Sequence, residues 1–266
     1  MTRRRLDLEL IHRGLAATLG EAREAIDGGR VTVGGRPATK PATLVAPDEP
    51  VHVEGAPRPY ASRGGEKLAG ALDALGVDPT GRHAMDLGAS TGGFTDVLLA
   101  GGAAHVVAVD VGYGQLAWRL RTDPGVTVLE RTNARELSPE SLPYRPDLVT
   151  ADLSFISLTK VVPVVARVVA PGADVVLLVK PQFEASRGEV GRGVITDPAV
   201  WGRALDAVAE ACGAAGLGAM GATPSSLPGP AGNVELFLHV REGERGRDLD
   251  LDGVIAAASR VRGRAS

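Results

Sequence analysis

The sequence predicts an α/β protein in which a small N-terminal α+β domain precedes a larger, doubly wound parallel sheet. The length of 266 residues exceeds one ordinary domain of ~100–200 residues but falls short of three. With 44% hydrophobic and 23% charged residues, the chain can build packed cores and does not have the composition of a disordered protein. From residue 62 onward, strand-like apolar segments alternate with helical patterns, which is typical of a parallel sheet covered on both faces.

The small domain is expected to occupy residues 1–57. Apolar residues spaced through 6–15 predict an amphipathic helix, and residues 20–27 predict a second helix that ends at a Gly-Gly pair. Residues 30–38 hold two short strand segments around another Gly-Gly pair, which predicts a β-hairpin. A further strand is expected at 51–53.

The larger domain is expected at residues 64–241, after a linker at 58–63 that adjoins a proline-rich stretch. Residues 242–266 form a polar tail with one helix at 253–261. The last sheet strand is expected to be antiparallel to its neighbours. Strands are predicted at 84–87, 106–110, 126–129, 148–152, 175–180, 218–223 and 234–240. Helices are predicted at 65–75, 94–100, 115–121, 159–169 and 198–213.

Several classes of protein are disfavoured by simple counts. The single cysteine, Cys212, excludes an intramolecular disulfide framework and a cysteine-rich zinc site, and it fits a reducing cytoplasmic location. The basic N-terminus lacks the apolar run of a secretory signal. The most apolar region, 161–179, is interrupted by prolines and charges, so we expect no membrane span. The 29 basic residues comprise 25 arginines and only four lysines, so each lysine needs its own explanation.

A glycine-rich loop follows the first sheet strand. Its spacing is D-x-G-x-x-x-G from Asp86 through Gly88 to Gly92, and it precedes a helix whose N-terminus favours an anionic group. Asp110 ends the next strand, 22 residues beyond Gly88, at the reach expected for binding a ribose diol. The departure from G-x-G-x-x-G disfavours a nicotinamide dinucleotide and favours S-adenosylmethionine. Without the paired acid, an ordinary glycine turn would explain the loop as well.

Seven motifs stand out between residues 62 and 240: SRGGEKL at 62–68, DLGASTGGFTDVLL at 86–99, VVAVDVGYGQLAWRLR at 106–121, ERTNAR at 130–135, DLSFISL at 152–158, LVKPQFE at 178–184 and GNVELFLHV at 232–240. With them the chain resembles the TlyA family of bacterial rRNA 2′-O-methyltransferases, which are also named haemolysins. Residues 5–53 resemble the S4 RNA-binding domain of that family, and the larger domain resembles its FtsJ-type (RrmJ-like) methyltransferase fold. The resemblance implies methyl transfer from S-adenosylmethionine to the 2′-hydroxyl of cytidines in 16S and/or 23S rRNA.

The resemblance also implies a Lys-Asp-Lys-Glu catalytic tetrad, matched here by Lys67, Asp152, Lys180 and Glu235. Lys180 would be the base or the residue that orients the hydroxyl, Asp152 its charge partner, and the other two a flanking pair. The chemistry suits lysine because its amine can exchange a proton, whereas an arginine stays protonated. Each position alone is more often a solvated strand end. Lys160 is expected to be a solvated charge, and Lys40 a phosphate contact or a surface charge.

Cofactor and RNA contacts complete the predicted site. Phe155 is expected either to form an apolar wall for the adenine or to be an ordinary core residue. The expected cofactor-binding residues are Gly88, Ala89, Ser90, Thr91, Gly92, Asp110, Asn133 and Phe155. The expected RNA-binding residues are Arg3, Arg4, Arg5, Arg13, Arg23, Arg30, Arg63, Arg187 and Arg192. No metal site is expected.

The net charge of −3 is unevenly distributed. Residues 1–40 carry a net charge of +3 and residues 58–67 one of +2, so positive charge gathers in the small domain and the linker. We therefore expect rRNA within 30S and/or 50S subunits as the partner, with no membrane and no obligate protein partner. Two alternatives are a catalytically inactive RNA-binding or ribosome-assembly factor and a membrane-acting haemolysin. Loss of the tetrad would favour the first, and a strongly amphipathic cationic helix the second.

Overall fold

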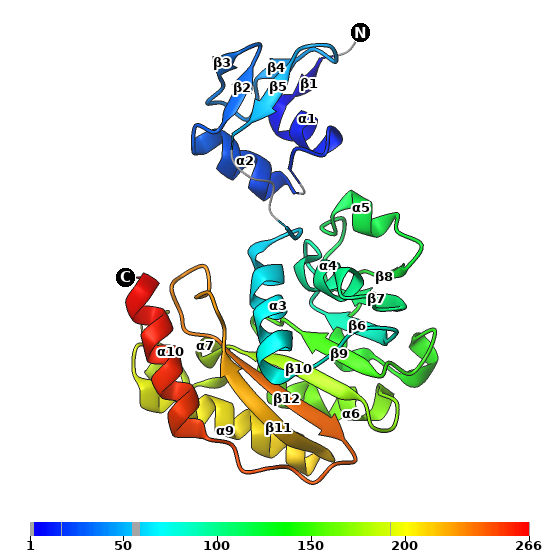
Figure 1. Ribbon diagram of the computed structural model, residues 1–266, viewed down its shortest axis with the longest axis vertical. Coiled ribbons are helices and arrows are strands. Elements are labelled where there is room, and N and C mark those ends of the chain that lie inside the picture. The colour runs from blue at the N-terminus through cyan, green and yellow to red at the C-terminus, as the bar shows by residue number, and fades with distance from the viewer. Residues whose placement is uncertain (1–2, 17, 55–58, 192, 266) are drawn as a thin grey trace.

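The computed structural model describes residues 3–16, 18–54, 59–191 and 193–265. Figure 1 shows the small N-terminal domain at one end and the larger sheet domain, with its covering helices, at the other. The α/β fold and the small α+β domain predicted from the sequence are both confirmed.

The small domain packs two helices against short strands around a core that includes Leu6, Leu10 and Ile26. Thr18 begins the second helix, because its side chain accepts a hydrogen bond from the Glu21 backbone N–H. Two small sheets, one of two strands and one of three, complete it, and the two-residue strands of the first are too short to give a sequence signal. The elements are β1 (Arg4–Arg5), α1 (Leu6–His12), α2 (Leu19–Asp27), β2 (Val31–Val33), β3 (Arg36–Pro37), β4 (Leu44–Val45) and β5 (Val51–Val53).

The larger domain is built on a seven-stranded sheet with the order β11-β12-β10-β9-β6-β7-β8. All pairings are parallel except those of β12, which is antiparallel to both β10 and β11, as the sequence predicts for the last strand. The strands are β6 (His83–Leu87), β7 (His105–Val109), β8 (Val126–Leu129), β9 (Leu148–Ala151), β10 (Asp174–Val179), β11 (Leu217–Pro224) and β12 (Leu236–Glu242).

Two predicted helices are shorter than expected. The helix predicted at 115–121 forms only over its last four residues, and the one predicted at 159–169 splits at Val161. Pro163 accounts for the split, because proline is favoured in the first turn of a helix and not in its interior. The helices are α3 (Arg63–Leu75), α4 (Gly93–Ala100), α5 (Trp118–Arg121), α6 (Val162–Val168), α7 (Pro181–Glu184), α8 (Arg187–Val190), α9 (Pro198–Ala214) and α10 (Leu251–Ala265), with 3₁₀ turns η1 (Ala134–Glu136), η2 (Pro139–Ser141) and η3 (Leu158–Lys160).

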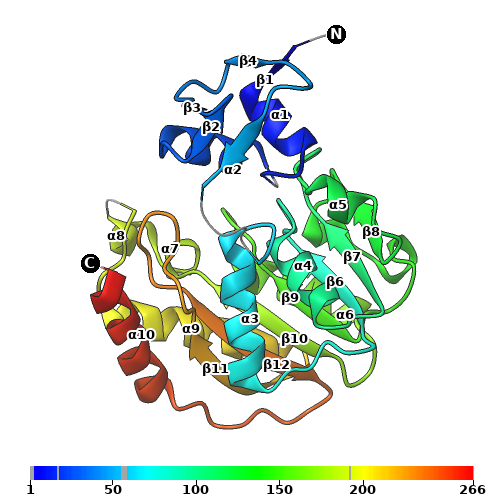
Figure 2. The ribbon, with the colours of Figure 1, turned by 45° about the horizontal axis from the view of Figure 1, so that its top comes forward.

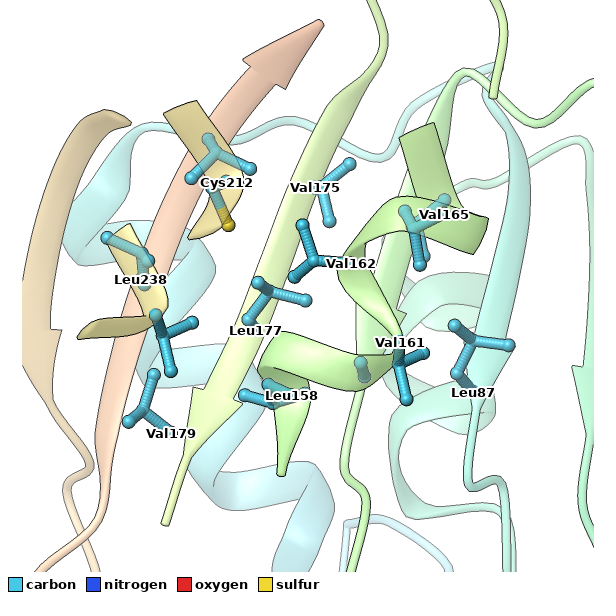
Figure 3. Close-up of a cluster of buried hydrophobic side chains, with 14 of the residues drawn as sticks. Leu87, Leu158, Val161, Val162, Val165, Val175, Leu177, Val179, Cys212 and Leu238 are labelled. Carbon is cyan, nitrogen blue, oxygen red and sulfur yellow. The ribbon is translucent and has the colours of Figure 1, made fainter. Parts of the chain in front are cut away.

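The apolar segment 161–179 lies in the core between the sheet and its covering helices. Figure 3 shows Val162 and Val165 of α6 facing Val175 and Leu177 of β10, with Cys212 of α9 in the same cluster. Within the described residues, no helix is long and apolar enough to cross a membrane. This hydrophobic segment therefore serves packing.

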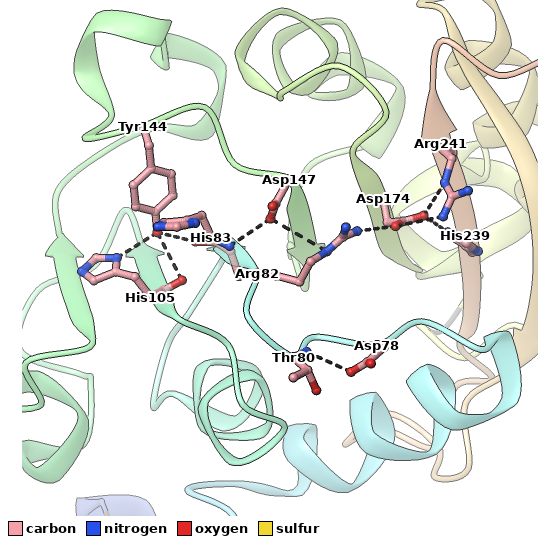
Figure 4. Close-up of polar contacts among 11 residues, drawn as sticks. Asp78, Thr80, Arg82, His83, His105, Tyr144, Asp147, Asp174, His239 and Arg241 are labelled. Carbon is pink, nitrogen blue, oxygen red and sulfur yellow. Dashed lines mark hydrogen bonds and ion pairs between the residues drawn. The ribbon is translucent and has the colours of Figure 1, made fainter.

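The amino-terminal edge of the sheet is held by a network of charges centred on Asp174 (Figure 4). This buried carboxylate accepts hydrogen bonds from Arg82, from His239 Nε2 at 2.8 Å and from Arg241 Nε at 2.8 Å. Burial alone would raise the pKa of Asp174, but these hydrogen bonds hold it well below its ordinary value. The network ties β10 to β12 at the end opposite the glycine-rich loop.

The C-terminal segment adds a helix to the larger domain. In both views α10 runs beside α9 and β11 (Figures 1 and 2), and Ala258 is fully buried there. The predicted helix at 253–261 is therefore present, and it is longer than expected.

Candidate active site

The glycine-rich loop after β6 requires glycine at two positions. Gly88 has a φ of +83°, and a Cβ there would lie 2.4 Å from the backbone oxygen of Asp152. Gly92 has a φ of +97°, and its Cβ would lie 2.3 Å from Leu120. Because L side chains rarely adopt such backbone angles, only glycine allows the loop this conformation. The loop thereby comes into direct contact with the carboxyl end of β9.

Asp110 lies beside this loop at the carboxyl end of β7. Its carboxylate accepts the Ser90 N–H at 2.7 Å and the Gly112 N–H at 2.6 Å. Asn133 lies close to Asp110 in space, because the N–H of the adjacent residue Thr132 donates to the Asp110 backbone oxygen at 3.0 Å. The Asn133 side chain itself accepts the Arg135 N–H at 3.1 Å and begins η1. The fold thus brings the three cofactor candidates Ser90, Asp110 and Asn133 to one edge of the sheet.

Asp86 is a functional candidate that sequence reasoning did not assign. Its buried carboxylate accepts the hydroxyls of Thr95 at 2.7 Å and Thr150 at 3.3 Å. Burial raises the pKa of Asp86 to about 7, against the opposite effect of the Thr95 hydrogen bond. It lies beneath the loop, two residues before Gly88, where it supports the turn. The sequence signal that could have identified Asp86 is its place as the aspartate of the D-x-G-x-x-x-G pattern.

The four tetrad candidates form two lysine–carboxylate pairs in one cavity. Lys67 Nζ on α3 lies 2.6 Å from Glu235 Oε2, just before β12. Lys180 Nζ, directly after β10, lies 2.5 Å from Asp152 Oδ1, directly after β9. Lys180 also donates to Ser154 Oγ at 3.0 Å. The carboxyl ends of the parallel strands β9 and β10 meet at the same edge of the sheet, which explains why Asp152 and Lys180 come together. Lys67 and Glu235, 168 positions apart, meet because α3 packs at this edge and the antiparallel β12 begins there.

The two pairs differ in solvent access. The side chains of Lys67 and Glu235 are 8% and 2% exposed, whereas Asp152 keeps 26% of its side-chain surface exposed. A buried lysine without its carboxylate would strongly destabilise the folded protein, because its charge would be unpaired. Lys67 and Glu235 therefore stay paired as a fixed part of the site. Asp152 is thus the most open member of the tetrad, and its partner Lys180, with 11% of its side-chain surface exposed, lines the same cavity, where a substrate atom can reach both.

Phe155 projects from the loop after β9 with a φ of +64° and 92% of its surface exposed. The alternative of an ordinary core phenylalanine is therefore wrong. Its ring packs at a tilt against Phe183, with centroids 5.2 Å apart. Phe183 was not assigned from the sequence, although it lies within the motif LVKPQFE. The exposed Phe155 and the partly buried Phe183 together offer an aromatic surface next to Lys180.

The tetrad candidates, most of the glycine-rich loop and the two phenylalanines line one cavity of about 680 Å³. It joins the glycine-rich loop to the tetrad candidates and to Phe155 and Phe183, and Arg63 and Gly64 line it at the start of α3. Three of the predicted cofactor-binding residues, Gly92, Asp110 and Asn133, do not line it. Site residues that line it are Arg63, Lys67, Gly88, Ala89, Ser90, Thr91, Asp152, Phe155, Lys180 and Glu235.

Most of the predicted RNA-binding arginines in the small domain have acidic partners. Arg4 and Arg13 both pair with Glu9, and Arg5 and Arg23 both pair with Asp7. Arg13 additionally donates to the backbone oxygens of Ala46, Pro47 and Glu49, so its guanidinium fixes the loop at residues 46–49. Of the other candidates, Arg3 and Arg63 are exposed and Arg30 is partly exposed, whereas Arg192 and the side chain of Arg187 lie outside the described residues.

No cluster of three or more His, Cys, Asp or Glu side chains suited to a metal ion occurs in the described part of the chain. A seven-stranded sheet with one antiparallel strand, a glycine-rich loop after its first strand and an acid after the next defines an S-adenosylmethionine-dependent methyltransferase. Family models support this class and add the small domain: residues 60–242 match the FtsJ-like methyltransferase model and residues 4–51 match the S4 domain.

The chain belongs to the TlyA family. It is 51% identical over 261 residues to the 16S/23S rRNA (cytidine-2′-O)-methyltransferase TlyA of Mycobacterium tuberculosis, covering 97% of each chain. It is 35% identical to Hemolysin A of Brachyspira hyodysenteriae, over 88% of this chain and 98% of that one. A solved structure described as a hemolysin from Streptococcus thermophilus is 33% identical, covers 100% of this chain and 98% of that one, and gives a TM-score of 0.78.

Proposed function

We propose that this chain transfers a methyl group from S-adenosylmethionine to the ribose 2′-hydroxyl of cytidine in 16S and/or 23S rRNA. The observation that carries the proposal is the meeting of two lysine–carboxylate pairs with the glycine-rich loop in one cavity. The rRNA substrate follows from the activity named for the M. tuberculosis relative. For such an activity we expect the chain to act in the cytoplasm, with 30S and/or 50S subunits as its partners.

The residues around the loop fit the cofactor. Gly88 and Gly92 let the loop adopt its positive-φ turn against Asp152 and Leu120, and Ala89, Ser90 and Thr91 between them line the cavity. We assign the loop to the amino-acid end of S-adenosylmethionine. Asp110 would hold the ribose diol and Asn133 the region of the adenine. When bound, the cofactor supplies an electrophilic methyl group on a sulfonium.

Lys180 is our assignment for the group that orients the 2′-hydroxyl and takes up its proton. Its amine lies at the cavity lining, and its contacts with Asp152 and Ser154 leave it fixed in direction. A hydroxyl held in line with the methyl group reacts faster because its orientation is already set. A lysine amine that has released a proton can accept one from the hydroxyl, which a guanidinium cannot do. The Lys67–Glu235 pair also lines the cavity, and its opposite charges add no net charge there.

The aromatic pair of Phe155 and Phe183 is suited to the nucleobase. Phe155 and Phe183 present ring surface at the cavity that holds Lys180, and stacking on an aromatic ring is a common way to hold an unstacked RNA base. We therefore assign Phe155 to the RNA side of the cavity as well as to the site wall. Arg63, exposed at the same opening, is the arginine best placed to contact a phosphate.

The test is incubation of the purified protein with labelled S-adenosylmethionine and unmodified 30S and 50S subunits, followed by mapping of 2′-O-methyl positions. We expect incorporation by the wild type, none by Lys180→Ala, and wild-type incorporation by the control Lys160→Ala, which removes an exposed lysine on η3. Absence of incorporation by the wild type, with retained rRNA binding, would instead favour a catalytically inactive RNA-binding factor.

A further inference from the structure

The short segment that follows β10 holds the loop that follows β9 at two points. At one end, Lys180 contacts Asp152 and Ser154. At the other end, the Glu184 carboxylate accepts the Ser157 hydroxyl at 2.5 Å. The two contact points bracket the exposed Phe155. The β9 loop, residues 152–158, is therefore fixed from both sides by residues 180–184.

Glu184 acts on the backbone of this loop as well as on a side chain. Its Oε1 accepts the Leu158 N–H at 2.8 Å, at the first residue of η3. That N–H belongs to a helix start, where backbone donors lack a partner within the turn. The Ser157 hydroxyl also contacts Thr159 Oγ1 at 2.6 Å. One carboxylate thus fixes the point at which the β9 loop ends.

The surroundings of Glu184 show that its contacts are not those of a solvated surface acid. The side chain is partly buried, and burial raises the pKa of the Glu184 carboxyl while the two hydrogen bonds act in the opposite direction. A hydrogen bond to a charged acceptor in a partly dehydrated place is stronger than an exposed one.

The loop needs such a restraint because its backbone is strained. Phe155 has a φ of +64°, a conformation that is unfavourable for a residue with a bulky side chain. Its side chain is 92% exposed, so its only ring contact among the described residues is with Phe183, inside the same 180–184 segment. Without an anchor at its far end, the loop would relax towards an ordinary backbone conformation and carry Asp152 and Ser154 away from Lys180.

We infer that Glu184 is a positioning residue for methyl transfer, which fixes the β9 loop so that Asp152, Ser154 and Phe155 face the reacting ribose. The inference rests on the proposed function and deepens it. Glu184 does not line the cavity, so it acts through the loop and not by touching substrate.

The test compares initial rates of methylation of 30S and 50S subunits for Glu184→Ala, Glu184→Gln and the control Glu210→Ala, an exposed acid on α9. Glutamine can accept the Leu158 N–H and donate to the Ser157 hydroxyl, so it keeps the geometry without the charge. We expect kcat for Glu184→Ala to fall roughly 10- to 100-fold through loss of two charge-assisted hydrogen bonds. Glu184→Gln should stay within about threefold of the wild type, and S-adenosylmethionine affinity within about twofold for every variant.

Ser157→Ala serves as a second variant because it removes one of the two contacts and leaves the carboxylate in place. It should reduce kcat in the same direction but less than Glu184→Ala. The inference is overturned if Glu184→Ala matches an active wild type, if glutamine is as damaging as alanine, or if cofactor affinity falls in parallel with the rate. An inactive wild type would instead overturn the proposed function, and the inference with it.

Discussion

The contact between the glycine-rich loop and the β9 loop gives a quantitative prediction for Gly88→Ala. The new Cβ would lie 2.4 Å from the Asp152 backbone oxygen, whereas ordinary contacts lie at 3.4–4 Å. The two backbones must therefore separate by about 1 Å, since a backbone oxygen cannot rotate away as a side chain would. An alanine at this φ of +83° is also strained, which destabilises the variant by about 1–2 kcal/mol.

Gly81→Ala is a matched control because it separates strain from contact. Gly81 has a φ of +71°, but nothing lies within 4 Å of a Cβ built there. Overpacking adds about 1–3 kcal/mol to the Gly88 variant alone. For a domain of this size, each 1 kcal/mol lowers Tm by about 2–4 °C. We therefore expect the Tm of Gly88→Ala to lie at least about 2–4 °C below that of Gly81→Ala.

Cofactor binding should separate the two variants more sharply. Calorimetric titration with S-adenosylmethionine should show a loss of about tenfold or more for Gly88→Ala, because a displacement of about 1 Å misplaces the loop. The Gly81→Ala protein should bind like the wild type. Equal Tm values and equal affinities for the two variants would refute the reasoning that the Gly88–Asp152 contact sets the loop.

Three further predictions concern charge. Glu235→Gln leaves the buried ammonium of Lys67 without a counter-charge and should cost about 3 kcal/mol in urea unfolding, whereas replacing both residues by Met should recover most of that stability without restoring activity. His239 and Arg241 hold the folded-state pKa of Asp174 below its unfolded value of about 3.9. The contribution of Asp174 to the free energy of unfolding is therefore complete above that pH and is lost as pH falls through the acid range. Unfolding free energies measured between pH 5 and pH 3 should thus decline less steeply for Asp174→Asn than for the wild type, and parallel curves would contradict this. RNA affinity should fall linearly on a log–log plot against salt concentration, measured by filter binding, and a flat plot would exclude phosphate contacts.

Local patterns in the sequence predicted the elements that neighbours along the chain determine. Alternating strand and helix patterns gave all seven strands of the large sheet to within one or two residues, because buried parallel strands are short apolar runs bounded by turns. The glycine spacing located the loop after β6. The tetrad candidates came from resemblance to a family, since a lone lysine or acid at a strand end carries no signal of its own.

Tertiary structure decided which side chains meet. The pairing of Lys67 with Glu235 depends on where α3 packs against the sheet and on how the antiparallel β12 is placed in it. Local sequence patterns do not predict either contact. The same is true of the small domain, where Asp7 and Glu9 neutralise arginines that charge counting alone assigned to RNA.

The sequence by itself determined the fold class, the place of the cofactor loop and the family of this protein. Only the tertiary structure decided that Phe155 is exposed and not part of the core, and that Glu184 reaches the loop that carries it. The physical reason is that periodicity records which face of an element is buried, whereas contacts between loops depend on the register and packing of distant strands.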